Sequence, residues 1–155
     1  MHIHLLAVGE KMPAWVETGF HDYCKRLPRD WRLQLHEIPL AKRGKNATAA
    51  QWLAEEGARL RAAIPAGAHT VALAIAGQTW TSEEFATVLQ RWRDMAKPIA
   101  LLIGGPDGLA PDVLAQAAER WSLSPLTLPH PLVRIVIAEQ LYRAWSLLHH
   151  HPYHR

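Results

Sequence analysis

Residues 103–108, with the sequence IGGPDG, have the composition of a ligand-binding loop. They follow an apolar run that we expect to be a strand, and they precede a predicted helix. In open α/β sheets, ligands bind beyond the carboxyl ends of the strands. Gly104 and Gly105 would let a ligand approach the backbone and reach peptide N–H groups. The patterns of a P-loop and of a dinucleotide fingerprint are both absent. The alternative interpretation is an ordinary turn between a strand and a helix.

Residues 121–131, with the sequence WSLSPLTLPHP, form a second candidate segment that is apolar and contains three prolines. Proline removes a backbone donor and restricts the path of the chain. A stiff apolar loop with free carbonyl groups suits a flat heteroaromatic ligand such as adenine. The alternative is a buried crossover that only packs against the core.

Basic residues offer a surface for phosphate groups. Lys42, Arg43 and Lys45 lie close together in a predicted polar loop at residues 40–46. Further positive charge comes from Lys25, Arg26, Arg29 and Arg32. Such residues neutralise phosphates on nucleic-acid-binding surfaces, although a solvated charged surface is the commoner explanation. The formal net charge of +3 permits an RNA partner without identifying one.

The histidine-rich end at residues 149–155, HHHPYHR, matches no zinc-ligand spacing, so we expect no metal and favour a tail that faces RNA or a partner. The single cysteine, Cys24, fits a reducing compartment, and its place on a predicted amphipathic helix favours an unreactive thiol. The N-terminus lacks the features of a secretory signal, and no apolar run reaches the roughly 18 residues of a membrane span. We therefore expect a cytoplasmic protein with no membrane association.

Hydrophobic periodicity predicts alternating strands and helices along the whole chain. The expected strands are residues 3–8, 33–38, 70–75, 99–103 and 121–123. The expected helices are residues 13–26, 47–63, 81–95, a segment starting at Pro111, and residues 132–149. Thr81 and Glu84 have the spacing of a capping box. This order predicts one α/β domain over residues 1–155, including a short tail at 150–155, with a mostly parallel sheet and helices on both faces.

The last predicted helix is apolar on nearly every side, and its narrow polar strip consists of Glu139, Arg143 and Ser146. A helix of this kind is buried, and a chain of 155 residues has little material to cover it. We expect the sheet on one side and a second subunit on the other, which predicts a homodimer. The alternative is burial within one chain. Glu139 and Arg143 are four residues apart, so a simple intrahelical ion pair is also expected.

Three motifs taken together resemble the ribosomal large-subunit pseudouridine N3-methyltransferases, which are minimal members of the SPOUT or α/β-knot superfamily. The motifs are LLIGGPDG at 101–108, LTLPHPLVR at 126–134, and AEQLYRAW at 138–145 followed by HPYH at 151–154. The resemblance begins near the N-terminus, with AVG at 7–9 and KMP at 11–13, continues through KRGKN at 42–46, and covers essentially the whole chain. It departs only in the histidine run and in the variable helix at 47–63.

The resemblance implies a SPOUT fold with a C-terminal trefoil knot and S-adenosylmethionine as the cofactor. It also implies methylation of N3 of a pseudouridine in large-subunit (23S) ribosomal RNA. Because the net charge is only +3 and no aromatic base-stacking module is evident, we expect an assembled ribosome to supply much of the recognition. Three loops would hold the cofactor, at residues 73–77, 104–108 and 123–128. The implied cofactor-binding residues are Leu73, Gly104, Gly105, Leu123, Ser124, Pro125, Leu126, Thr127 and Leu128.

Methyl transfer to N3 of a uracil-type ring requires loss of a proton, so a base or an anion-stabilising group is expected. His130 directly follows the cofactor loop and is the candidate base, the alternative being a structural histidine at a turn. Arg143, Tyr153, His154 and Arg155 are candidates for holding RNA phosphate or stabilising the uracil anion. A dimer could bring the tail of one subunit to the cofactor of the other.

Two other classes of function are compatible with these residues. The first is a methyltransferase that acts on another RNA or at another position. The second is a non-enzymatic module that binds RNA or assists ribosome assembly and retains the fold without transferring a methyl group.

Overall fold

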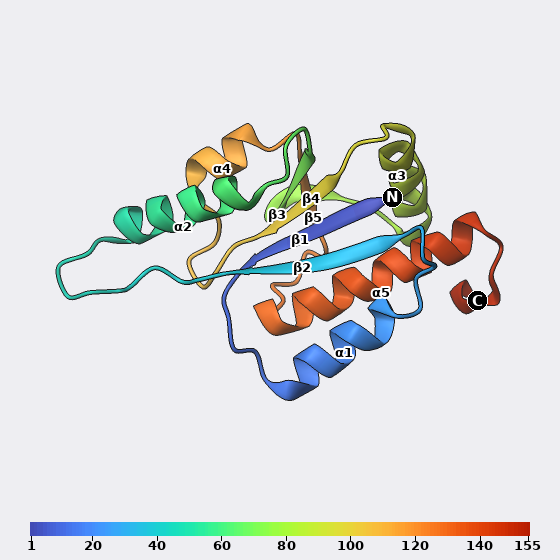
Figure 1. Cartoon of the computed structure of the whole chain (residues 1–155), viewed down its shortest axis with the longest axis horizontal. Coiled ribbons are helices and arrows are strands. Elements are labelled where there is room, and N and C mark those ends of the chain that lie inside the picture. Colours follow the sequence, from blue (N-terminus) through green and yellow to red (C-terminus); the bar gives the residue numbers. More distant parts are fainter.

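The computed structural model covers residues 1–155 and consists of a five-stranded sheet with helices on both faces (Figure 1). The strands are β1 (His2–Val8), β2 (Arg32–Ile38), β3 (His69–Thr79), β4 (Ile99–Ile103) and β5 (Glu119–Ser122). The helices are α1 (Ala14–Cys24), α2 (Ala49–Ala63), α3 (Ser82–Asp94), α4 (Pro111–Gln116) and α5 (His130–Leu148), followed by a 3₁₀ turn at Pro152–His154. The strand order is β2-β1-β4-β3-β5, and every neighbouring pair is parallel. The predicted α/β class and element order are confirmed.

Side chains alternate across the sheet, and this alternation divides the core into two layers. Ile3 and Leu5 of β1 belong to the layer beneath α1, α3 and α5, whereas Leu6 and Val8 belong to the layer beneath α2 and α4. All five residues of β4 are buried. A parallel strand that is covered on both faces has a continuous apolar sequence, which is why residues 99–103 were predictable from composition alone.

Two predicted helix starts are decided by threonine caps. Thr81 and Glu84 form the expected capping box, and α3 begins at Ser82. Thr48 caps α2 in the same way, with Gln51 in the reciprocal position, so α2 begins two residues later than predicted. In both helices the threonine hydroxyl satisfies a backbone N–H that has no partner within the helix.

Strands β3 and β5 differ from their predicted bounds. β3 continues to Thr79, and its ladder with β5 is irregular between Leu73 and Gln78, so the intervening residues bulge out of the sheet. Gly77 is required there, because a Cβ would lie 2.8 Å from the backbone nitrogen of Trp121. β5 begins at Glu119, two residues before the expected start. The polar residues Glu119 and Arg120 concealed only the first part of this edge strand from a hydrophobicity pattern.

Helix α5 is covered within the chain more completely than its sequence suggested. It packs against α1 and α3, and Ile137 and Leu141 are fully buried. Ser146 belongs to the buried part instead of a solvated polar strip, and its hydroxyl donates to the carbonyl of Arg143. Leu132 in the first turn of α5 stays 40% exposed. The second subunit therefore stays a prediction.

None of the helices combines the length and apolar character needed to cross a membrane. No group of three or more His, Cys, Asp or Glu side chains is arranged to hold a metal ion.

Candidate functional site

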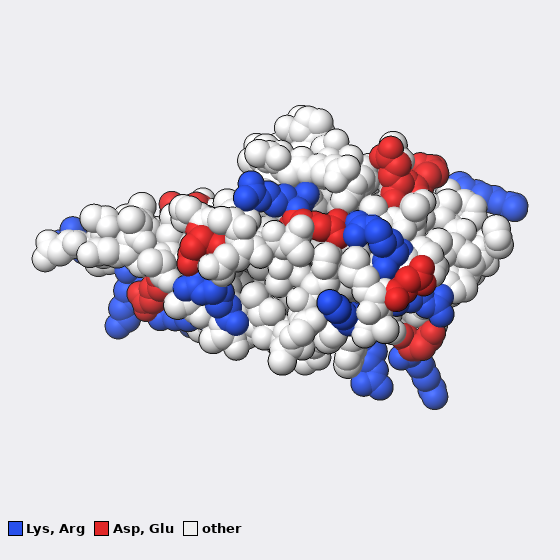
Figure 2. Space-filling model, turned by 90° about the horizontal axis from the view of Figure 1, so that it is seen from above, with Lys and Arg blue, Asp and Glu red and all other residues white.

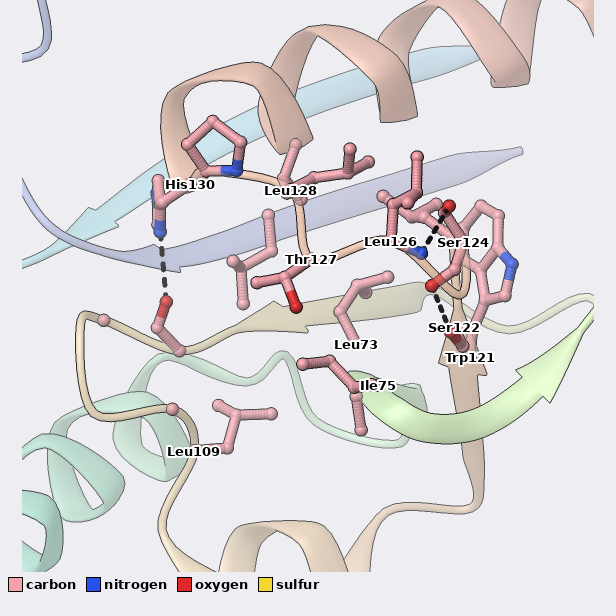
Figure 3. Close-up of a pocket in the computed structure, with 18 of the residues that line it drawn as sticks. Leu73, Ile75, Leu109, Trp121, Ser122, Ser124, Leu126, Thr127, Leu128 and His130 are labelled. Carbon is pink, nitrogen blue, oxygen red and sulfur yellow. Dashed lines mark hydrogen bonds between the residues drawn. The ribbon is translucent and has the colours of Figure 1, made fainter.

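A cavity of about 420 Å³ opens at the carboxyl ends of β3, β4 and β5 (Figure 3). These strands are neighbours in the sheet, so the bulge within β3 and the segments that follow β4 and β5 converge on one place. The lining comes from residues 73–75 in the β3 bulge, from 103–106, 108 and 109 after β4, and from most of 121–130 after β5. Its volume lies in the range of small-molecule sites. The two segments that the sequence marked as ligand loops therefore meet, and the β3 bulge joins them.

The cavity brings together all the predicted cofactor-binding residues except Pro125. Those that line it are Leu73, Gly104, Gly105, Leu123, Ser124, Leu126, Thr127 and Leu128. Pro125 lies in the same segment but is exposed and outside the lining. Ile75, from the implied loop at 73–77, is also in the lining, and Leu109 and Val133 add apolar walls that the sequence analysis did not assign to the site.

The loop after β4 is closed tightly on itself. The N–H of Gly108 donates to the carbonyl of Gly105 at 3.0 Å, and Gly108 has a φ of 81°. A Cβ on Gly104 would lie 2.3 Å from the carbonyl carbon of Gly108. A Cβ on Gly105 would lie 3.1 Å from Leu40 Cδ2. The expectation that these glycines leave room for a ligand stays a prediction, but the backbone of Gly108 by itself already excludes a Cβ at Gly104. Loop closure is the first reason for glycine here.

Serine hydroxyls hold the irregular segment that follows β5. Ser122 Oγ donates to the carbonyl of Ser124 at 3.1 Å, and Ser124 Oγ accepts from the N–H of Leu126 at 2.9 Å (Figure 3). Together with the prolines, these bonds restrict a segment that has no ladder partners. The side chain of Leu126 is held at the mouth of the cavity, where it is 73% exposed.

His130 begins α5 and lies between one donor and one acceptor. Its Nδ1 donates to the carbonyl of Gly104 at 3.0 Å, and its Nε2 accepts from Arg134 Nε at 2.9 Å (Figure 3 shows the first bond). A carbonyl can only accept and a guanidinium can only donate, so the ring is the neutral Nδ1–H tautomer. Burial is the main cause that lowers the pKa of His130, and the charge of Arg134 lowers it further against opposing contributions from Gly104 and Glu37. The basic lone pair of Nε2 is therefore occupied.

Arg134 is a site residue to which the sequence analysis assigned no role. It is only 2% exposed, and besides His130 it donates to Glu37 Oε2 at 2.8 Å and to the carbonyl of Gly9 at 2.9 Å. It therefore joins the end of β2 and the loop after β1 to the N-terminus of α5. The available signal was a single cation in the apolar first turns of the helix, because a cation in such a run is buried only when it is paired.

Arg143, Tyr153 and His154 lie near the other end of α5 and do not line the cavity. Arg143 Nη2 and the Tyr153 hydroxyl both donate to Glu139 Oε1, at 2.7 and 2.9 Å. Burial and the contact with Glu139 raise the pKa of Tyr153 to about 12, so its hydroxyl keeps its proton at neutral pH. His154 Nδ1 is buried without a hydrogen-bond partner. At 1.5 Å per residue, Arg143 is about 20 Å along the helix from His130.

The predicted basic residues divide into paired and unpaired groups. Lys25 and Arg26 pair with Asp22, while Arg29, Arg32, Lys42 and Lys45 make no ion pair. Cations and anions are interspersed over the face seen in Figure 2, without one broad positive field. The Cys24 thiol has its pKa raised to about 12 by burial, which agrees with the expected unreactive thiol.

The sheet is parallel, and apolar loops that contain several glycines and prolines line a cavity beyond three adjacent strands. This arrangement is typical of α/β proteins that bind small molecules. The family model described as "Predicted SPOUT methyltransferase" matches residues 1–154. The chain belongs to this family of methyltransferases.

Several curated relatives are named "Ribosomal RNA large subunit methyltransferase H". Those from Pseudomonas putida (strain F1) and Stutzerimonas stutzeri are each 54% identical to this chain over 155 residues, and that from Azotobacter vinelandii is 53% identical. Each alignment covers 100% of this chain and 100% of the relative.

Two solved structures have a similar fold. One is "a probable methylase family protein" from Haemophilus influenzae, with a TM-score of 0.57, 10% identity, and coverage of 96% of this chain and 68% of that chain. The other is a "Probable Methyltransferase" from Bordetella pertussis, with a TM-score of 0.56, 15% identity, and coverage of 92% and 95%. They agree with the SPOUT assignment at the level of the fold. The trefoil knot stays a prediction.

Proposed function

We propose that this protein is an S-adenosylmethionine-dependent methyltransferase that modifies N3 of a pseudouridine in 23S ribosomal RNA, acting on assembled ribosomes. The observation that carries the proposal is the 54% identity over full length to relatives named as large-subunit ribosomal RNA methyltransferases. The specific nucleoside comes from the motifs at 101–108, 126–134 and 138–154. A single domain over residues 1–155, located in the cytoplasm, completes the proposal.

The cavity is suited to this cofactor. Leu73, Ile75 and Leu128 supply apolar walls for an adenine ring, and the glycine loop supplies backbone groups. The lining contains no Asp, Glu, Lys or Arg, so hydrogen bonds to the ligand must come mainly from the backbone, Ser and Thr. When bound, S-adenosylmethionine supplies an electrophilic methyl group. The chain must supply alignment, which can lower the barrier by several kcal/mol.

The hydrogen bonds of His130 support its structural alternative over the role of base. Protonation of Nε2 would break the bond from Arg134 and place two cations side by side. We therefore propose that His130 positions residues 104–108 through the carbonyl of Gly104. Arg143, Tyr153, His154 and the tail end at Arg155 would act on the acceptor side, where they orient the ring or the RNA backbone and stabilise the anion that deprotonated N3 carries.

A homodimer would resolve the separation between the cavity and the acceptor-side residues. Arg143 lies about 20 Å along α5 from His130 in one chain, and residues 153–155 follow the far end of this helix. The tail of one subunit would therefore serve the cavity of the other. Two apolar side chains of the cavity lining are exposed, Ile75 at 68% and Leu126 at 73%, and so is Leu132 in the first turn of α5, at 40%. A second copy that covers them would gain hydrophobic free energy.

The test is nucleoside mass spectrometry of ribosomal RNA from a strain that lacks the gene. We expect N3-methylpseudouridine to disappear from 23S RNA and to return when the purified protein and S-adenosylmethionine are added to the ribosomes. Loss of a different methylated nucleoside, or of one in transfer RNA, would favour a methyltransferase with another target. Unchanged nucleosides, together with no S-adenosylmethionine binding in calorimetry, would favour a non-enzymatic RNA-binding module.

A further inference from the structure

Arg43 differs from its neighbours in the basic loop between β2 and α2, which comprises residues 39–48. This loop extends away from the body of the molecule (Figure 1). Lys42 and Lys45 are exposed and make no ion pair. Arg43 instead donates to Glu56 Oε2 at 2.7 Å through Nη1 and to Asp107 Oδ2 at 3.0 Å through Nη2. One guanidinium group therefore connects the basic loop with the cavity loop at residues 104–108.

The Asp107 end of this connection has a second donor. Trp52 Nε1 of helix α2 donates to the same carboxylate oxygen at 2.9 Å, and the Arg43 guanidinium lies 5.3 Å from the centroid of a Trp52 ring. Asp107 is next to the lining residues Pro106 and Gly108. The cavity loop is thus held from its outer side by groups that belong to the β2–α2 region.

The Glu56 end is buried. Glu56 is 2% exposed, and its Oε2 also accepts from the N–H of Ala41 at 3.1 Å. Its Oε1 is buried without a hydrogen-bond partner and lies 3.6 Å from the position that a Cβ on Gly105 would take. A buried carboxylate needs a cation for compensation, and Arg43 is the only cation paired with it. Arg43 is therefore committed to intramolecular contacts.

We infer that Arg43 is a positioning residue that fixes the cavity loop through Asp107 and Glu56, and that it couples contact of Lys42 and Lys45 with ribosomal RNA phosphate to cofactor binding in the cavity. The identities of the RNA and the cofactor rest on the proposed function. Because both loops share one guanidinium group, a ligand that orders one loop lowers the entropic cost of ordering the other. By linkage, the same factor acts in both directions.

The first experiment measures S-adenosylmethionine affinity by calorimetry without ribosomes. Arg43→Gln should weaken it about tenfold, within the range of energies reported for coupled contacts. The affinity of Arg43→Lys should lie between those of Arg43→Gln and the unaltered protein, because lysine keeps the charge but cannot donate to both carboxylates. The matched control, Lys42→Gln/Lys45→Gln, should bind S-adenosylmethionine like the unaltered protein. Unchanged affinity in Arg43→Gln, or an equal loss in the control, would overturn the positioning role.

Asp107→Asn keeps the pair between Arg43 and buried Glu56, so it tests the same link if Arg43→Gln does not fold. It should also weaken S-adenosylmethionine binding. In a double-mutant cycle, Arg43→Gln/Asp107→Asn should lose less affinity than the sum of the two single losses. Strict additivity would show that the two residues act independently and would overturn the link.

The second experiment repeats the titration with saturating ribosomes. S-adenosylmethionine should bind the unaltered protein at least fivefold more tightly than without ribosomes, the lower end of usual coupling, and Arg43→Gln should lose this gain. Lys42→Gln/Lys45→Gln should bind ribosomes more weakly with a smaller salt dependence. Its gain should shrink even at saturation, because the contacts that order the basic loop are missing. A gain that persists in Arg43→Gln overturns the coupling. If the unaltered protein does not bind ribosomes, the proposed function fails, while the calorimetric loss without ribosomes still supports the positioning role.

Discussion

His130 connects the protonation state of one side chain to the shape of the cavity loop. Its pKa lies below the ordinary 6.5, chiefly because the ring is buried. Because the pKa is lower in the folded protein, the unfolded chain binds more protons between the folded and the unfolded pKa. The contribution of His130 to the free energy of unfolding is therefore present above pH 6.5 and is lost as the pH falls through the folded pKa. Protonation of Nε2 would also break the bond from Arg134, which helps to hold the ring that positions the cavity loop. S-adenosylmethionine affinity should therefore be constant above neutral pH and decrease in acid.

His130→Asn provides the comparison. An Asn amide can still donate to the carbonyl of Gly104, but it does not titrate, so binding should lose its decrease in acid while it retains part of the affinity at pH 7. Calorimetry over pH 5–8 measures both. If turnover instead shows a titration below pH 6.5 that the variant lacks, at unchanged cofactor affinity, His130 would be the base after all.

The glycines of the cavity loop should differ in their tolerance of a methyl group. Gly104→Ala places a Cβ 2.3 Å from the backbone of Gly108 and forces the loop to open, whereas Gly105→Ala meets side-chain atoms at 3.1 Å or more. We expect Gly104→Ala to cost about 1–3 kcal/mol and at least a tenfold loss of cofactor affinity, with a smaller loss for Gly105→Ala. Gly44, which has no atom within 4 Å of an added Cβ, is the control. Thermal denaturation and calorimetry would show whether this order holds.

At the scale of elements, Glu119 fastens the end of the sheet opposite the cavity. It begins edge strand β5 and accepts hydrogen bonds from Arg91 and Trp92 of α3 and contacts His69 of β3. Burial acts to raise its pKa, but these partners together lower it to about 2. A lowered carboxyl pKa gives stability that is present above the unfolded pKa of about 4.5 and is lost as the pH falls toward 2.

Glu119→Gln should therefore reduce the free energy of unfolding at pH 7 by about 2 kcal/mol, the usual scale for hydrogen bonds to a charged group. The reduction should shrink in acid, because below about pH 4.5 the carboxyl group of the unfolded chain binds a proton that the folded chain takes up only near pH 2. Glu55→Gln removes an exposed pair with Arg59 and should change stability by less than about 1 kcal/mol. Urea denaturation at pH 7 and pH 3 tests this prediction, and equal losses at both pH values would contradict it.

At the scale of the whole molecule, the exposed apolar residues predict a dimer at micromolar concentration. Leu132→Glu places a charge on the exposed part of α5 and should shift the protein toward monomer in sedimentation velocity. Ala50→Glu, an exposed position on α2 across the sheet, is the matched control. A monomeric unaltered protein would remove the basis for a shared site.

The tail prediction depends on that assembly. Deletion of residues 153–155, or Arg143→Ala, should lower turnover on ribosomes about 10²–10³-fold, the usual loss for an orienting or charge-stabilising group. Cofactor affinity should hardly change, because these residues lie outside the cavity. Mixed dimers of Arg143→Ala chains with Gly104→Ala chains should recover turnover if the tail acts across the dimer. Near-normal turnover of the truncated protein would exclude a role for the tail.

The sequence by itself determined the alternation of strands and helices, the capping of α3, and the two segments, 103–108 and 121–131, that supply most of the cavity lining. These properties are local, because they depend on periodicity, cap chemistry and the backbone freedom of glycine and proline. It also sufficed for the family, since motifs at 101–108, 126–134 and 138–154 occur together.

Only the tertiary structure decided which residues meet. It brought the β3 bulge together with the segments after β4 and β5, and it placed Arg134 and the carbonyl of Gly104 against the two ring nitrogens of His130. It also showed that Arg43, unlike the unpaired lysines beside it, pairs with Glu56 and Asp107, which come from distant parts of the chain. Hydrogen bonds between residues far apart in the sequence leave no periodic trace, so the roles of these side chains could be recognised only after the sheet had brought them together.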